Sequence, residues 1–152
     1  MTQAGFKTGA MAGLVAGAIF LAVELVMVPL VLGGALWGPP RMMAAIAMGD
    51  GVLPPPATFD AGIVLVGMLV HFALSAVLGV VFAAMAKAMN LSGTKAIVAG
   101  AVFGLLVYLV NFYGLTAVFP WFEMARNWVT IFAHLVFGGV LGWYYRSPAA
   151  AR

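Results

Sequence analysis

Two histidines are the residues of this 152-residue chain that most clearly suggest chemistry. They are the only histidines in the sequence, and each lies inside a long apolar run. Their surroundings match: His71-Phe-Ala-Leu-Ser-Ala-Val-Leu-Gly79 and His134-Leu-Val-Phe-Gly-Gly-Val-Leu-Gly142 share the histidine, Val-Leu and the last glycine. An ionisable residue in a membrane-spanning segment is costly, and it marks a candidate functional site.

Composition predicts that these runs cross a membrane. The chain is 65% hydrophobic and 7% charged, and its mean hydropathy is +1.14. Several runs exceed the ~18 apolar residues that a helix needs to span a bilayer. We therefore expect one polytopic domain, residues 1–152, whose main partner is the lipid bilayer. The seven basic residues form no cluster, so nucleic-acid binding has no support. Without cysteine there are no disulfides and no thiolate chemistry.

Four membrane-spanning helices are expected, at about 5–32, 59–89, 95–118 and 122–146. The connections after the second and third helices are short, which predicts an all-α, up-down four-helix bundle. The long first connection, 33–58, contains Pro39-Pro40 followed by a short amphipathic stretch. This stretch is too brief to span, and we expect it to form an interfacial helix. Pro54-Pro55-Pro56 then predicts a stiff extended segment.

The helices pair into two similar hairpins, 1–89 and 93–146. Ala12-Gly-Leu-Val-Ala-Gly17 resembles Ala99-Gly-Ala-Val-Phe-Gly104 at an offset of 87, and the same offset aligns Glu24 with Asn111. The histidine segments align at an offset of 63, and the long first connection accounts for the difference. Two parallel repeats related by a pseudo-twofold axis along the membrane normal explain both offsets. Chance similarity between helices rich in Gly, Ala and Val is the alternative.

Glycines recur at helical spacing in three of the four helices. Such small-residue faces let helices approach closely in lipid, where packing drives association. Faces that the chain does not use itself would favour a homo-oligomer or a larger membrane complex. The glycines are Gly5, Gly9, Gly13 and Gly17 in the first helix, Gly100 and Gly104 in the third, and Gly138 and Gly142 in the fourth.

Four polar residues are predicted to meet inside the bundle: Glu24, His71, Asn111 and His134. At 1.5 Å per residue the first three lie about 24–26 Å from the basic residues at the cytoplasmic boundary, and the last about 18 Å. We expect all four on inward-facing stripes in the outer half of the bilayer. The residues predicted to support this buried polar site are Ser75, Tyr108, Asn127, Thr130 and Arg126.

Three roles stay open for such a cluster. It can be structural, because buried polar side chains need partners whatever else they do. It can handle protons or bind a small ligand, since histidine titrates near neutral pH. It can also hold a cofactor: two opposed imidazoles suit haem b in an electron-transfer subunit, and His71, His134 and Glu24 would suit a divalent metal.

Catalysis is not indicated. Ser75 lies one turn from His71, but no third group follows to orient the pair. The glycines lie in helices and form no phosphate-binding loop. We therefore expect a protein without catalytic chemistry.

Basic residues near the helix ends predict the orientation. With the N-terminus inside, five face the cytoplasm and two face outward, which favours cytoplasmic termini. The inner set is Lys7, Lys87, Lys95, Arg146 and Arg152, and the outer set is Arg41 and Arg126.

Several short patterns resemble the YagU-type proteins of the bacterial inner membrane. They are Ala12-Gly-Leu-Val-Ala-Gly, Val70-His-Phe-Ala-Leu-Ser, and Trp121-Phe-Glu together with Phe132-Ala-His-Leu-Val-Phe. The resemblance covers most of the chain, which is shorter than those proteins and has a more compact first connection. It implies a small multi-pass inner-membrane protein associated with acid tolerance, with His71 and His134 at shared positions.

Overall fold

All regular secondary structure in the described residues, 3–55 and 57–147 of the computed structural model, is helical. Residues 1–2, 56 and 148–152 lie outside the described residues, and they include Pro56 of the predicted proline segment and Arg152 of the predicted inner set. The principal helices are α1 (Gln3–Leu32), α2 (Gly38–Met48), α3 (Ala61–Ala88), α4 (Gly93–Leu109) and α5 (Trp128–Tyr144). Short helical turns complete the chain: η1 (Asp50–Val52), η2 (Val110–Gly114), η3 (Leu115–Ala117) and η4 (Pro120–Ala125).

Three helical segments are long and apolar enough to cross a membrane. They are residues 5–32 of α1, the whole of α3, and residues 93–117, where α4 continues through η2 and η3. The fourth apolar helix, α5, has 17 residues and is therefore about 25 Å long. It is close to the shortest length that spans a bilayer core.

Side-chain caps set where α3 and α5 begin. The Ile63 amide donates to the Asp60 carboxylate at 2.9 Å, and the Thr130 amide donates to the Asn127 side-chain oxygen at 3.0 Å. Such caps satisfy amides that have no partner within the helix. The fourth helix was expected to begin near Phe122, but that residue lies in the 3-10 turn η4, and α5 begins only after the Asn127 cap.

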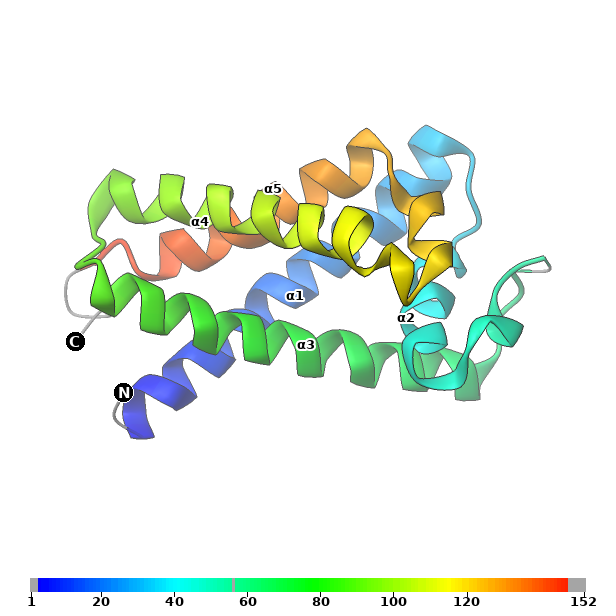
Figure 1. Cartoon of the computed structure of the whole chain (residues 1–152), viewed down its shortest axis with the longest axis horizontal. Helices are drawn as coiled ribbons and strands as arrows, with labels where there is room; N and C mark the ends of the chain where they lie inside the picture. The colour runs from blue at the N-terminus through cyan, green and yellow to red at the C-terminus, as the bar shows by residue number, and fades with distance from the viewer. Residues whose placement is uncertain (1–2, 56, 148–152) are drawn as a thin grey trace.

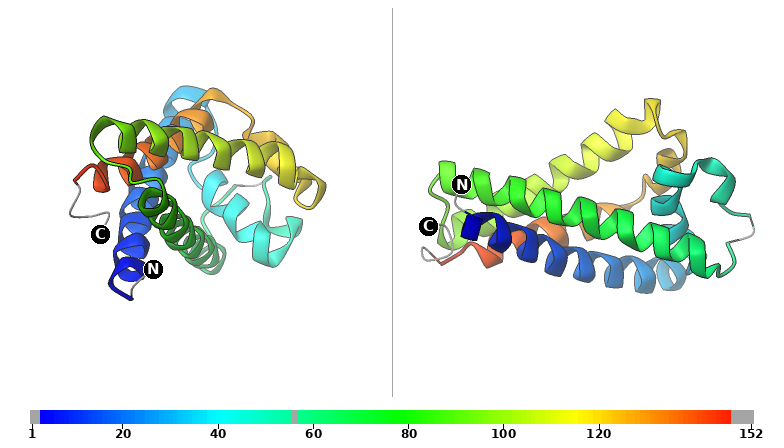
Figure 2. Two further views of the ribbon diagram at one scale, coloured as in Figure 1. Left: turned by 60° about the vertical axis from the view of Figure 1, so that its left-hand side comes forward. Right: turned by 90° about the horizontal axis from the view of Figure 1, so that it is seen from below.

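The chain runs back and forth along one long axis. α1 packs against α3 and α5, and α4 packs along α5, whereas α3 and α4 spread apart from the turn that joins them (Figures 1 and 2). α1 begins and α5 ends at the same end of the molecule (Figure 1). The helices of each predicted hairpin therefore lie together, and α1 joins the two hairpins through α5.

Glycines bring α1 and α3 into backbone contact. A Cβ added at Gly13 would overlap the backbone carbonyl of Ser75, and one added at Gly79 would overlap the carbonyl oxygen of Gly9. Gly5, nearer the start of α1, is half-buried. Because main chains meet where side chains would otherwise separate them, this crossing requires glycine.

The crossing of α4 and α5 is built in the same way. A Cβ at Gly100 would overlap the carbonyl oxygen of Gly138, and one at Gly104 would overlap the carbonyl oxygen of His134. A Cβ at Gly142 would overlap the carbonyl oxygen of Ala96. The glycine faces of α4 and α5 are therefore buried against each other.

The short helix α2 packs into the bundle beside the start of α3 (Figure 2). A Cβ at Gly67 of α3 would overlap the Pro40 carbonyl of α2, and Ala44 and Ala45 are fully buried. Met42 and Ile46 pack on the aromatic cluster at the far end of α4. The helix predicted in the first connection is present, and its buried face contacts protein side chains.

Candidate functional site

The carboxyl group of Glu24 is buried on α1. The residue is 6% exposed, and Oε1 has no hydrogen-bond partner among the described residues. The Thr130 hydroxyl of α5 lies beside this carboxyl group, but it donates to the Asn127 side-chain oxygen at 3.3 Å. A buried carboxyl oxygen without a donor is costly.

Glu24 faces a cavity of about 420 Å³. His71, Asn127 and Thr130 supply the other polar groups of its lining, and the remaining walls come mainly from the end of α1, the following loop and α2. We call this space the Glu24 cavity.

The His71 imidazole links two helices. Its Nε2 atom, on α3, lies 2.9 Å from the carbonyl oxygen of Gly17 on α1. Because a carbonyl oxygen only accepts, Nε2 carries the proton, and Nδ1 of the neutral ring is left as an acceptor. A Cβ at Gly17 would press on Ser75 and lie 3.3 Å from Nε2. Glycine at position 17 is thus what allows this bond.

The His134 imidazole bonds within its own helix. Its Nδ1 atom lies 2.8 Å from the carbonyl oxygen of Thr130, one turn earlier on α5. By the same reasoning Nδ1 donates, and Nε2 is the acceptor. Each histidine thus donates its ring N–H to a backbone carbonyl, and its other ring nitrogen keeps a free lone pair.

Phe20 of α1 packs against both imidazoles. Its ring centroid lies 5.5 Å from that of His71 and 4.9 Å from that of His134. Sequence reasoning missed this residue, although its place four residues before Glu24 and three after Gly17 puts it on the same face of the helix. The rings of Tyr108 and Phe112 also meet His134 edge-on, with centroids at 5.6 and 5.5 Å.

A second cavity, of about 490 Å³, lies between α3 and α4. Both histidines and Asn111 line it, and we call it the histidine cavity. Asn111 lies in the π-helical turn η2, and such turns are frequent at functional sites.

The four predicted site residues therefore do not share one space. His71 lines both cavities, Glu24 lines only the first, and Asn111 and His134 line only the second. The phenylalanine ring at position 20 borders both cavities.

Most of the predicted supporting residues have structural contacts. Ser75 is buried in the α1–α3 crossing, Asn127 caps α5, Thr130 connects that cap to both Glu24 and His134, and Tyr108 packs on the His134 ring.

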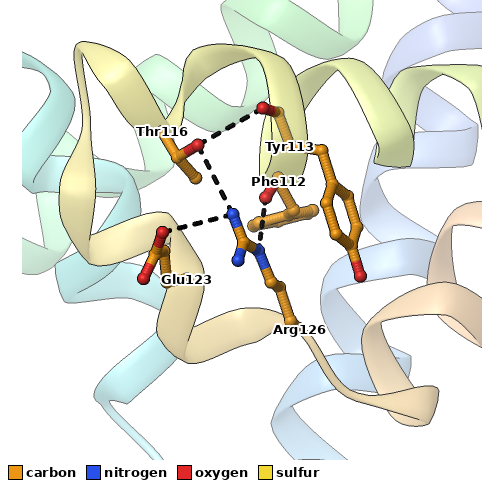
Figure 3. Close-up of polar contacts among 5 residues, drawn as sticks. All are labelled: Phe112, Tyr113, Thr116, Glu123 and Arg126. Atoms are coloured by element: carbon orange, nitrogen blue, oxygen red, sulfur yellow. Dashed lines mark hydrogen bonds and ion pairs between the residues drawn. The ribbon is translucent and has the colours of Figure 1, made fainter.

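Arg126 is held by polar contacts within the connection between α4 and α5 (Figure 3). Its Nε donates to the Phe112 carbonyl at 2.7 Å, and Nη2 lies 3.3 Å from Glu123 Oε1 and 3.4 Å from the Thr116 hydroxyl. The guanidinium group also sits 4.5 Å from the centre of the Tyr113 ring. These contacts tie η4 to the π-helical turn.

The arrangement does not favour the cofactor alternatives. Among the residues that the structure describes, no three His, Asp or Glu side chains form a group that could hold a metal ion. A haem bound by both histidines would have to use Nδ1 of His71, because Nε2 is bound to Gly17. It would also have to displace the Phe20 ring that packs on both imidazoles.

No family model matches the sequence, and neither curated proteins nor solved structures give a match.

Proposed function

We propose that the protein is a small integral membrane protein without catalytic chemistry, whose buried Glu/His cluster handles protons or binds a small ligand. The observation that carries this proposal is the Glu24 carboxyl group, buried with Oε1 unpartnered and facing a cavity. In an apolar interior a carboxyl group needs a proton, a cation or hydrogen-bond donors to balance it. If the cluster has more than a structural role, the Glu24 carboxyl group is therefore the place where a proton or a hydrogen-bond-donating ligand would bind.

We further propose a four-helix bundle made of two tandem hairpin repeats. The support is that close contacts in the two hairpins correspond at the two sequence offsets, 87 for the first helix of each hairpin and 63 for the second. The corresponding contacts are Gly13–Ser75 with Gly100–Gly138, and Gly79–Gly9 with Gly142–Ala96.

The proposed location is the bacterial inner membrane, with both termini in the cytoplasm. An even number of crossings agrees with α1 beginning and α5 ending at the same end of the molecule. The resemblance to the YagU-type proteins would connect proton handling in this membrane with acid tolerance.

The alternative of a structural accessory subunit is less favoured. It depended on a free glycine face on the first helix, but Gly9, Gly13 and Gly17 pack against α3 within the chain. A homo-oligomer through that face is less favoured for the same reason.

Infrared spectroscopy of the purified protein tests the role of Glu24. We expect a carbonyl stretching band from a protonated carboxyl group, and we expect Glu24→Gln to abolish it. The chain has only four Asp and Glu side chains, which makes the band simple to assign. Glu123→Gln is the matched control, because its carboxylate is exposed and paired with Arg126. A band that survives Glu24→Gln would contradict the proposal.

An optical spectrum of the same sample checks the haem alternative. A Soret band that is lost in His71→Ala and in His134→Ala would establish haem and displace the proposal.

A further inference from the structure

The histidine cavity opens along the side of the molecule, between α3 and α4. Leu74 and Val77 form part of the α3 wall, and Leu106 and Val110 form part of the α4 wall. Each of these four side chains is about half exposed. In a membrane-spanning bundle such side chains meet the hydrocarbon of the bilayer. A ligand would therefore reach this cavity from the lipid.

The histidine cavity is lined by two imidazole acceptors that receive no hydrogen bond from any residue that the structure describes, and Ser75 and Asn111 supply the other polar side chains of the lining. His71 and His134 each donate one ring proton to a backbone carbonyl, and their remaining ring nitrogens have no hydrogen-bond partner among the described residues. A ligand that satisfies two imidazole lone pairs must carry hydroxyl or amine hydrogens.

The lining also selects for the shape of a ligand. It contains six phenylalanine rings, and the Asn111 side chain adds an amide that can donate and accept. Aromatic pairs prefer stacked or edge-on contacts, so such a lining favours a planar ring. The volume of about 490 Å³ falls within the range of sites for small organic ligands. The six rings are Phe20, Phe103, Phe112, Phe119, Phe122 and Phe137.

We propose that the histidine cavity binds a lipid-soluble quinol. Its dihydroxy ring lies among the phenylalanines with its hydroxyl groups donating to His71 and His134, and its apolar tail leaves between α3 and α4. This inference goes beyond the proposed function, because it assigns a ligand to the cavity that Glu24 does not line. It involves binding alone, and no redox step.

If the ligand must donate hydrogen bonds to the two histidines, the reduced and oxidised forms of one quinone should bind differently. Titration of the detergent-purified protein with decyl-ubiquinol, followed by calorimetry, should give binding at least about tenfold tighter than titration with the matching quinone. The two have the same tail, but quinone carbonyls cannot donate to the two imidazole nitrogens, and polar groups left unpaired in a site reduce affinity. Equal binding of both, or no binding of the quinol, would overturn the inference.

Two variants on the lipid-facing side of α4 test the location. Leu106→Trp narrows the mouth of the cavity and should abolish quinol binding. Val102→Trp lies one turn away on the same helix, is similarly exposed and does not line the cavity, so it should bind like the unaltered protein. His134→Gln should reduce the preference for quinol over quinone, since an amide both donates and accepts.

Glu24→Gln separates this inference from the proposed function, because Glu24 does not line the histidine cavity. We expect this variant to lose the infrared band and to keep quinol binding. A wild-type protein that shows the band but binds no quinol would overturn this inference and leave the proposed function standing. Binding unaffected by both Leu106→Trp and His134→Gln would also overturn it.

Discussion

At the scale of single residues, each of the two buried histidines is held by one backbone carbonyl group. His71 depends on the carbonyl of Gly17, and His134 depends on the carbonyl of Thr130. Thr130 in turn gives both its amide and its hydroxyl group to Asn127. The Thr130 hydroxyl group, which lies beside the Glu24 carboxyl group, therefore also donates to the cap of α5, while Oε1 of Glu24 has no partner among the described residues.

Asn127→Ala tests that link. Removing a helix cap of this kind costs about 0.5–2 kcal/mol, so we expect a lower thermal stability. It also frees the Thr130 hydroxyl group to donate to Glu24, which should shift the infrared band of the carboxyl group to lower frequency. Asn127→Ser keeps an oxygen at the cap and should restore stability. If Asn127→Ala moves neither the melting temperature nor the band, the cap does not control the carboxyl group.

At the scale of secondary-structure elements, sequence periodicity located the long helices well because their apolar runs have clear limits. The prediction for α1 was 5–32 and the helix is Gln3–Leu32, and the prediction for α3 was 59–89 and the helix is Ala61–Ala88. The start of α5 and the π-helical turn that carries Asn111 were missed. Both depend on local hydrogen bonding, which an apolar pattern does not encode.

The prediction of the candidate site was limited in a similar way. Helical phase correctly indicated that Glu24, His71 and His134 are buried. It could not show that Glu24 and Asn111 line separate cavities, because that depends on how far α3 and α4 diverge. It also could not show which ring nitrogen of each histidine is already bonded.

Two neighbouring glycines of α5 test the packing of elements. A Cβ at Gly138 would overlap the backbone of Gly100 and lie 2.7 Å from the Gly104 nitrogen, whereas a Cβ at Gly139 has no atom within 4 Å. Gly138→Ala should therefore destabilise the protein by about 1–3 kcal/mol, the usual cost of overpacking. Gly139→Ala should leave the melting temperature unchanged or slightly higher, because alanine is the better helix former. Equal melting temperatures for the two variants would argue against tight packing of α4 on α5.

At the scale of the whole molecule, the two glycine crossings make each hairpin a unit, and α1 joins the units through its contact with α5. The same arrangement leaves α3 and α4 without a close contact beyond their connecting turn, which creates the histidine cavity. A bundle in which α3 and α4 also packed against each other along their length would have no lateral opening. The proposed ligand site is thus a consequence of how the hairpins are joined.

The proposed orientation can be tested with single cysteines, because the natural chain has none. We expect a membrane-impermeant maleimide to label Gly51→Cys and Met124→Cys in intact cells, since both lie in the proposed outer connections. Thr94→Cys and Ser147→Cys should react only after the membrane is opened. All four positions are exposed in the structure. A cysteine that is not labelled in intact cells is therefore shielded by the membrane, because the fold does not bury it. The reverse pattern would invert the orientation. If Met124→Cys and Ser147→Cys are labelled from the same side, α5 does not span, and the four-helix membrane bundle would have to be abandoned for three crossings.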